Sequence, residues 1–479
     1  MVFTTQIFLF WFLPLTLLLY YAMPTLRARG VVLLLMSYLF YGWWRPDFVL
    51  LMIGSSSVDY VCGRLLGSLG RRIATLAPGS PEARALRARQ RVVLLVSIGV
   101  NVTLLGYFKY ANFGVETLNA ILARFHVAPI AWAKVVLPIG ISFYTFESMS
   151  YAIDVYRGEV EPERSYLRYA GFIALFPHLV AGPIMRYKAL AAQLASRKHS
   201  LLLFSTGVLL FQMGFAKKLL VADNVAPVAD AAFALADPST REAWLGTLAY
   251  ALQIYFDFSG YSDMAIGLGM MFGFTLPWNF DAPYRSRSVT DFWRRWHISL
   301  STWLRDYLYI SMGGNRKGPV KTYLFLAITM LLGGLWHGAA WTFIAWGAYQ
   351  GAWLVVERLQ GKRPFFGSLP APIQVLATFA ITLFGWVFFR ADRISQAFHV
   401  IGVMLGVGGG GPGWLRLPHG RLELLAMASG IVIAFAARTS QQIVRAPSRL
   451  HLWGVPLLFL VAVLHLFFKS YTPFLYFQF

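Results

Sequence analysis

Long apolar runs separated by short polar stretches dominate the pattern of residues along the chain. A helix that crosses a membrane needs about 20 apolar residues, and fewer if it bends or enters only part of the bilayer. We therefore predict spans near residues 7–23, 31–44, 47–63, 92–110, 135–153, 169–185, 201–220, 245–272, 322–358, 372–390, 422–437 and 452–468, with 400–407 as a run too short to cross. The run at 322–358 is long enough for two spans, and Gly333-Gly334 is the expected break. The pattern predicts an all-α membrane protein with about 10 to 13 spans.

Composition identifies lipid, rather than water, as the main surroundings of the chain. Of the 479 residues, 57% are hydrophobic and 13% are charged, whereas charged residues make up about a quarter of a soluble domain. The net charge of +21 would suit nucleic-acid binding, but the basic residues form short clusters between apolar runs. Such clusters are typical of loops that face an anionic cytoplasmic leaflet. We expect the lipid bilayer, and no nucleic acid, as a partner.

Missing motifs exclude several common kinds of site. Cys62 is the single cysteine, so an intramolecular disulfide is impossible. The sequence has no Cys/His cluster with metal-ligand spacing, and we expect neither a metal nor a bound cofactor. It also lacks the Gly-x-Ser-x-Gly of serine hydrolases and the Gly-x-x-x-x-Gly-Lys-Ser/Thr of phosphate-binding loops.

Basic residues predict the orientation of the chain. The stretch 64–91 carries seven arginines against the single acid Glu82, so we expect it on the cytoplasmic side and the N-terminus outside. A second basic stretch, 281–321, holds eight Lys and Arg residues with aromatic and aliphatic residues at helical spacing between them. That mixture predicts an amphipathic helix at the cytoplasmic interface.

Two of the nine histidines are candidates for chemistry. His337 lies in an apolar run with glycines on both sides, which permit close approach of another backbone. Low-dielectric surroundings keep an imidazole neutral, and a neutral imidazole can take a proton from a hydroxyl. His297 lies in the basic segment, where a continuous helix would give it a common face with Trp293, Arg294 and Ser301. Either histidine could instead be a packed or interfacial residue without a catalytic role.

The sequence around these histidines resembles the bacterial membrane-bound O-acyltransferases. The likeness extends along nearly the whole chain and rests most strongly on the paired-histidine motif. Its segments are Pro283 to Ser288, Asp291-Phe292-Trp293-Arg294-Arg295-Trp296-His297, Trp303 to Ile310, Gly313-Gly314-Asn315-Arg316 and Leu335-Trp336-His337-Gly338. The resemblance implies a single domain, 1–479, with a ring of transmembrane helices around a thinned centre pierced by a tunnel.

The resemblance also implies residue roles and partners. His337 corresponds to the catalytic histidine of the family, and His297 to the earlier histidine near the donor. We expect an acyl group, acetyl in our interpretation, to pass from acetyl-CoA or a phosphopantetheine carrier to a hydroxyl. The donor-binding candidates are Trp296, Arg294, Arg305, Asn315, Arg316, Lys317 and Trp336. The expected pathway is O-acetylation of an exopolysaccharide such as alginate, at a bacterial inner membrane, with a periplasmic SGNH-type acetyltransferase as partner.

The aromatic C-terminal tail, 469–479, suggests a further reaction component. Its ending Phe-Leu-Tyr-Phe-Gln-Phe resembles the C-terminal motif of the small partner protein in D-alanylation systems. That resemblance implies that Tyr476 accepts the acyl group before handing it outward. The alternative is an aromatic anchor at the membrane interface, a frequent position for tyrosine.

Other functions stay open on the sequence alone. Related family members carry out D-alanyl transfer to teichoic acids or peptidoglycan O-acetylation. A transporter or flippase for a lipid-linked glycan would be a different class, but it predicts internal repeats and charge pairs near the bilayer midplane, which the sequence does not display. A scaffold that only recruits a periplasmic enzyme would not need His337.

Overall fold

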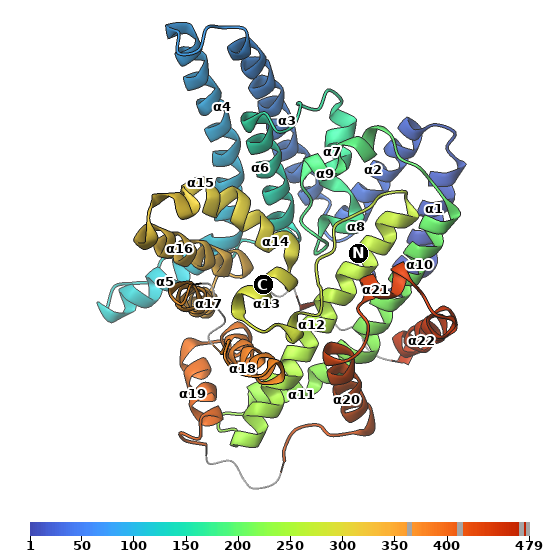
Figure 1. The fold of residues 1–479 in the computed structure, drawn as a ribbon, viewed down its shortest axis with the longest axis vertical. Coiled ribbons are helices and arrows are strands. Elements are labelled where there is room, and N and C mark those ends of the chain that lie inside the picture. Colours follow the sequence, from blue (N-terminus) through green and yellow to red (C-terminus); the bar gives the residue numbers. More distant parts are fainter. Residues whose placement is uncertain (362–365, 410–414, 469–473, 476–479) are drawn as a thin grey trace. The chain divides into compact units, whose positions relative to one another are not determined.

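The structure, a computed structural model, describes residues 1–361, 366–409, 415–468 and 474–475 (Figure 1). Within these ranges the chain forms helices, turns and irregular segments, and no β-strand. The helices group into unit 1, Met1–Phe204 with Leu268–Leu276, and unit 2, Ser205–Gly267 with Pro277–Phe479. The predicted all-α class is confirmed.

Unit 1 consists mainly of the first nine α-helices. They are α1 Leu13–Ala22, α2 Leu26–Gly42, α3 Asp47–Ala74, α4 Pro81–Leu105, α5 Ala111–Arg124, α6 Ile141–Arg157, α7 Tyr166–Ala174, α8 Phe176–Leu179 and α9 Tyr187–Ala195. Two π-helical turns, Phe8–Phe12 and Gly106–Tyr110, continue directly into α1 and α5.

Unit 2 contains the remaining helices. They are α10 Leu201–Ala216, α11 Asp223–Ala234, α12 Thr240–Met271, α13 Val289–Arg295, α14 Ile298–Trp303, α15 Ile310–Met312, α16 Pro319–His337, α17 Trp341–Leu359, α18 Ala371–Arg390, α19 Ile394–Met404, α20 Arg421–Phe435, α21 Ser440–Arg445 and α22 Arg449–Phe468. The ends of α10 and α12 belong to unit 1. Short π and 3-10 turns at Lys217–Ala222, Pro283–Arg285, Leu304–Tyr309 and Gly314–Lys317 connect several of these helices.

Six helical stretches in the described ranges are long and apolar enough to cross a membrane. They are Asp47–Ala74, Pro81–Arg124, Leu201–Ala234, Pro319–His337, Ala371–Arg390 and Arg449–Phe468. The chain is therefore a multi-pass membrane protein. The predicted number of spans is higher partly because the run 169–185 is not one helix. It is divided at Leu175, whose extended ψ of 106° precedes the short helix α8, and Pro177 lies in the first turn of α8, a position that proline favours.

The apolar run 322–358 does form two helices, but the predicted break at Gly333-Gly334 is wrong. Both glycines lie inside α16, and the chain leaves the helix at Gly338, where φ is −161°. A Cβ atom on Gly334 would lie 2.3 Å from the carbonyl oxygen of Phe343 and 3.1 Å from the Cα atom of Gly347. This glycine therefore permits close packing of α16 on α17, as small residues do between membrane helices.

Buried polar groups join α3 to α4 in unit 1. The carboxylate of Asp59 accepts hydrogen bonds from Ser97 (2.6 Å) and from the amide of Asn101 (2.9 Å). All three side chains are fully buried. An unpaired polar group in an apolar interior costs free energy, so these bonds specify which helix faces meet.

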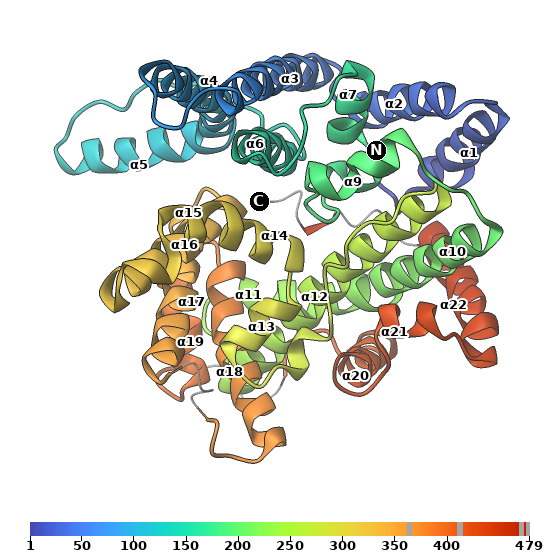
Figure 2. The ribbon, with the colours of Figure 1, turned by 45° about the horizontal axis from the view of Figure 1, so that its top comes forward.

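In unit 2, α10 and α12 run side by side (Figure 2). Their backbones approach closely at two places. A Cβ atom on Gly214 would lie 2.4 Å from the carbonyl oxygen of Gly260, and one on Gly267 would lie 2.5 Å from that of Gly207. Side chains at Gly214, Gly260 or Gly267 would separate the helices, so these glycines hold α12 against α10 and position the middle of α12 beside the candidate site.

Candidate active site

His297 lies at a backbone break, where the sequence predicts a continuous amphipathic helix over 281–321. That prediction is wrong. The segment contains short helices, and His297 has φ 44° and ψ 55° between α13 and α14. A left-handed conformation is unfavourable for a residue with a Cβ atom. Neighbouring bonds maintain it, because Ile298 N–H donates to the Asn279 carbonyl (2.9 Å) and Asp281 N–H donates to the Arg295 carbonyl (3.0 Å).

The imidazole of His297 is held by side chains from three segments. Its Nδ1 atom lies 3.1 Å from the Asn279 amide oxygen, which also accepts from the Ser299 hydroxyl (2.9 Å). The ring of Phe258, from α12, meets it edge-on with centroids 4.6 Å apart. Burial lowers the pKa of His297 to about 3. The ring is therefore neutral at cellular pH, and the bond to Asn279 favours the tautomer with hydrogen on Nδ1.

His337 is the last residue of α16 and lies in an aromatic enclosure. It is 3% exposed, and the rings of Trp346 and Phe389 lie 5.0 and 5.1 Å from its own. Its ring centroid is 6.4 Å from that of His297. The structure therefore brings together two histidines that are 40 positions apart in the sequence, in surroundings that exclude water.

Helix α17 fixes both histidine-bearing segments. Near its start, Gly347 contacts α16 so closely that a Cβ atom would lie 2.5 Å from the Met330 carbonyl oxygen. Farther along, the Glu357 carboxylate accepts from the backbone N–H groups of Val289 (2.6 Å) and Thr290 (2.9 Å) at the start of α13. An acid there also interacts favourably with the dipole of α13. The position of α13 relative to α16, and with it the separation of the two histidine-bearing segments, thus depends on α17.

The predicted donor-binding residues divide into two groups. Trp296 and Trp336 are buried at 2% and 3% exposure, and the Trp336 ring lies 5.8 Å from that of His297. The polar members are exposed instead, and they are Arg294, Arg305, Asn315, Arg316 and Lys317. The structure thus brings the two tryptophans to the histidines, while the polar members form a separate exposed set.

The C-terminal tail contributes Phe474 and Leu475 to this region. The backbone N–H of Leu475 donates to the Asp257 carboxylate on α12 (3.0 Å). Asp257 also forms a buried ion pair with Lys218 (2.6 Å). The ring of Phe474 packs on Tyr261 with centroids 4.7 Å apart, and it lies 6.2 Å from the ring of Phe258, which contacts His297. Tyr476, the predicted acyl acceptor, lies outside the described residues.

Sequence reasoning missed the residues that support the site. Asn279 has no recognisable signal, because only the fold brings it to His297. Asp257 and Lys218 could have been found, since both lie in apolar runs and an ionisable group in a membrane protein interior is a functional candidate. Lys218 also pairs with Asp223 (2.5 Å).

His178 belongs to unit 1 and forms a separate buried pair. Its Nδ1 atom lies 3.0 Å from the Glu147 carboxylate, and both side chains are fully buried. The backbone N–H of Met185 donates to the same carboxylate oxygen (2.9 Å). The pair links α6 to α8 and to the segment before α9.

Comparisons with known proteins identify the family of the chain. Residues 135–388 match the membrane-bound O-acyltransferase family. The protein named probable alginate O-acetylase of Pseudomonas putida is 46% identical over the full length of both chains, and that of Pseudomonas aeruginosa is 50% identical over 85% of this chain and 75% of its own. The peptidoglycan O-acetyltransferase of Helicobacter pylori is 35% identical over 85% of this chain and 80% of its own. The chain therefore belongs to the membrane-bound O-acyltransferase family and is an O-acyltransferase.

Proposed function

We propose that this chain transfers an acetyl group from a cytoplasmic thioester across a bacterial inner membrane, for O-acetylation of an exported polysaccharide such as alginate. The observation that carries the proposal is the buried pair His297 and His337, with ring centroids 6.4 Å apart. The names of the relatives support the substrate, since two are alginate O-acetylases that cover most or all of this chain. A periplasmic SGNH-type acetyltransferase is the expected partner.

His337 acts as the general base in this proposal. Its imidazole takes the proton of an acceptor hydroxyl while the oxygen attacks the thioester carbonyl carbon. The C–S bond then breaks, and the leaving sulfur takes the proton back from the imidazolium. Thioester to ester is downhill, so no nucleotide is consumed. A positioned base contributes roughly 10²- to 10⁴-fold in rate.

His297 has a different task, because its ring is neutral and held by Asn279. With hydrogen on Nδ1, its Nε2 atom is unprotonated and can accept a hydrogen bond. We assign it the task of orienting the acyl thioester by such a bond. The exposed residues Arg294, Arg305, Asn315, Arg316 and Lys317 bind the phosphates of coenzyme A or of a phosphopantetheine carrier. Guanidinium groups pair with phosphate through two parallel hydrogen bonds.

Tyr476 is the first acceptor in this scheme. The bond from Leu475 N–H to Asp257 holds the neighbouring residue of the tail, and Phe474 packs beside the ring that contacts His297. Leu475 is thus tethered, and it directly precedes in the sequence the tyrosine whose phenol would receive the acetyl group. The phenyl ester formed keeps more transfer potential than an alkyl ester, and a hydroxyl of the partner then takes the acetyl group and restores the phenol.

Purified protein in proteoliposomes tests the proposal directly. Labelled acetyl-CoA and an acetylated phosphopantetheine carrier are supplied separately, with a D-alanyl thioester as a third donor. We expect label on the C-terminal peptide from an acetyl donor, and a loss of at least 10²-fold in His337→Ala. His399→Ala is the matched control, because His399 is a half-exposed histidine on α19 to which the proposal gives no role. Full transfer by a correctly inserted His337→Ala protein would contradict the assignment, and transfer of D-alanyl alone would contradict the acetyl substrate.

A further inference from the structure

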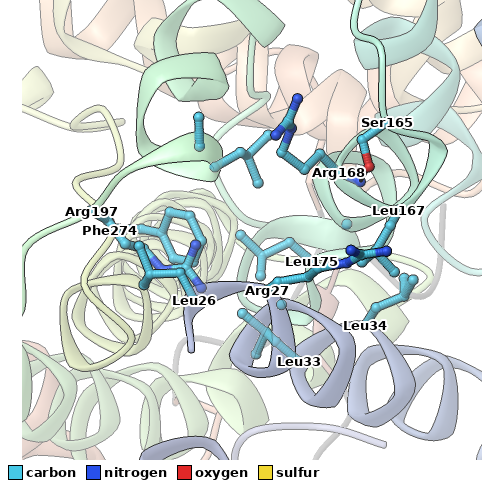
Figure 3. Close-up of a pocket in the computed structure, with 14 residues that line it drawn as sticks. Leu26, Arg27, Leu33, Leu34, Ser165, Leu167, Arg168, Leu175, Arg197 and Phe274 are labelled. Atoms are coloured by element: carbon cyan, nitrogen blue, oxygen red, sulfur yellow. Dashed lines mark hydrogen bonds between the residues drawn. The ribbon is translucent and has the colours of Figure 1, made fainter. Parts of the chain in front are cut away.

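Unit 1, which does not contain the paired histidines, has a pocket of about 400 Å³ between α2, α7 and α9 (Figure 3). Figure 3 shows Arg197 beside Phe274 on one side of the pocket and Ser165 near Arg168 on another. The wall is otherwise mostly aliphatic. Its apolar members include Leu26, Leu33, Leu34, Leu167, Leu175 and Leu194.

Arg197 is a buried cation without an acidic partner among the described residues. The residue is 8% exposed, and its Nη2 atom has no hydrogen-bond partner there. Its other donors reach neutral oxygens only, since Nε donates to the Tyr20 hydroxyl (2.9 Å) and Nη1 to the Gln193 carbonyl (3.4 Å). The guanidinium also lies over the ring of Phe274, 4.3 Å from its centroid. Burying a charge without a counter-charge is costly, so this site favours an anion.

A second cation adds to the positive charge of the pocket. Arg27 lines it, is exposed, and forms no ion pair within the described ranges. It lies in the first turn of α2, where the helix dipole also attracts anions. Arg168, in contrast, is neutralised by Glu163 at 2.6 Å. Two positive charges therefore remain uncompensated around one apolar cavity.

We propose that this pocket binds the phosphate headgroup of an anionic glycerophospholipid. Arg27 and Arg197 bind the phosphate, and Leu33, Leu34 and Leu175 contact the beginning of the acyl chains. The location is suitable, because Arg27 lies between the predicted spans 7–23 and 31–44, and a basic residue between two spans lies at the membrane surface. One predicted span, 7–23, separates Arg27 from the N-terminus, which is expected outside, so Arg27 is expected at the cytoplasmic leaflet, where anionic lipid is abundant.

Lipid binding to the full-length protein in detergent tests the inference. The probes are dioleoylphosphatidylglycerol and dioleoylphosphatidylcholine, counted by native mass spectrometry, with sn-glycerol 3-phosphate as the soluble competitor. We expect the first lipid to bind in preference, and Arg27→Gln and Arg197→Gln each to weaken it about tenfold, since a hydrogen bond to a charged group is lost. Arg29→Gln is the control, because Arg29 is two residues from Arg27 and does not line the pocket.

The outcomes separate the possible sources of the phosphate. Arg27 is exposed, so its replacement leaves the fold intact even if Arg197→Gln misfolds. Equal binding of the two lipids would overturn the proposal. An Arg29→Gln protein that loses as much lipid affinity as Arg27→Gln would also overturn it, because general electrostatic attraction to lipid would then explain the binding. Displacement of the lipid by millimolar glycerol phosphate would also overturn it, because the pocket would then recognise a soluble phosphate ester.

Discussion

Replacing Gly334 by alanine should displace His337, the proposed general base. The new Cβ atom would lie 2.3 Å from the Phe343 carbonyl oxygen, whereas ordinary contacts begin near 3.4 Å. Because the obstacle is backbone, α16 and α17 must separate by about 1 Å, at a cost of about 1–3 kcal/mol. His337 lies one turn farther along α16. A misplacement of about 1 Å near reacting groups can lower the rate about 10²-fold.

The neighbouring glycine gives a matched control in the same helix. A Cβ atom on Gly333 would meet only the Cδ1 atom of Leu304, at 3.2 Å, and a leucine side chain can move by a few tenths of an ångström. Both substitutions gain about 1 kcal/mol of helix propensity. Acetyl transfer should therefore be measured for both proteins, together with their thermal unfolding in detergent. Equal kcat values for Gly333→Ala and Gly334→Ala would refute the argument that the α16–α17 contact positions His337.

Three further predictions concern the tail and the donor surface. Tyr476→Phe removes only the hydroxyl and should abolish polymer acetylation and the acetyl adduct on the tail peptide seen by mass spectrometry; full activity would leave the aromatic-anchor alternative. Asp257→Asn replaces the charge-assisted hydrogen bond to the tail by a neutral one and also removes one carboxylate from Lys218; the loss of about 1 kcal/mol in the tail bond should lower the labelling of Tyr476 about fivefold, and unchanged labelling would contradict the tether. Charge reversal of Arg316 and Lys317 to Glu should raise the KM for the donor more than it lowers kcat, and labelling of Asn315→Cys from the periplasm alone would contradict the predicted orientation.

The sequence was sufficient for the class of fold, because long apolar runs can only be helices in a bilayer. It also singled out His297 and His337, chiefly through the resemblance of their motifs to the family, and the structure places their ring centroids 6.4 Å apart. It failed where tertiary contacts decide local structure. The helical spacing around His297 predicts a helix, but backbone bonds to the segment around Asn279 break it there. A pair of adjacent glycines in a sequence is compatible with either a bend or the close packing of another helix. At Gly334 the contact with α17 shows that packing is the reason.

The two contacts of α17 with the histidine-bearing segments lie a fixed number of helical residues apart, so the helical geometry of α17 sets the distance between the two histidines. Gly347 packs on α16, and Glu357, ten residues later, binds the start of α13. One inserted residue between them would rotate Glu357 by about 100° and advance it by about 1.5 Å, so it would no longer reach Val289. Insertions in the surface loops leave the separation of Gly347 and Glu357 along α17 unchanged. We expect the length of α17 between these two positions to tolerate no insertion, even where the loops at its ends vary freely.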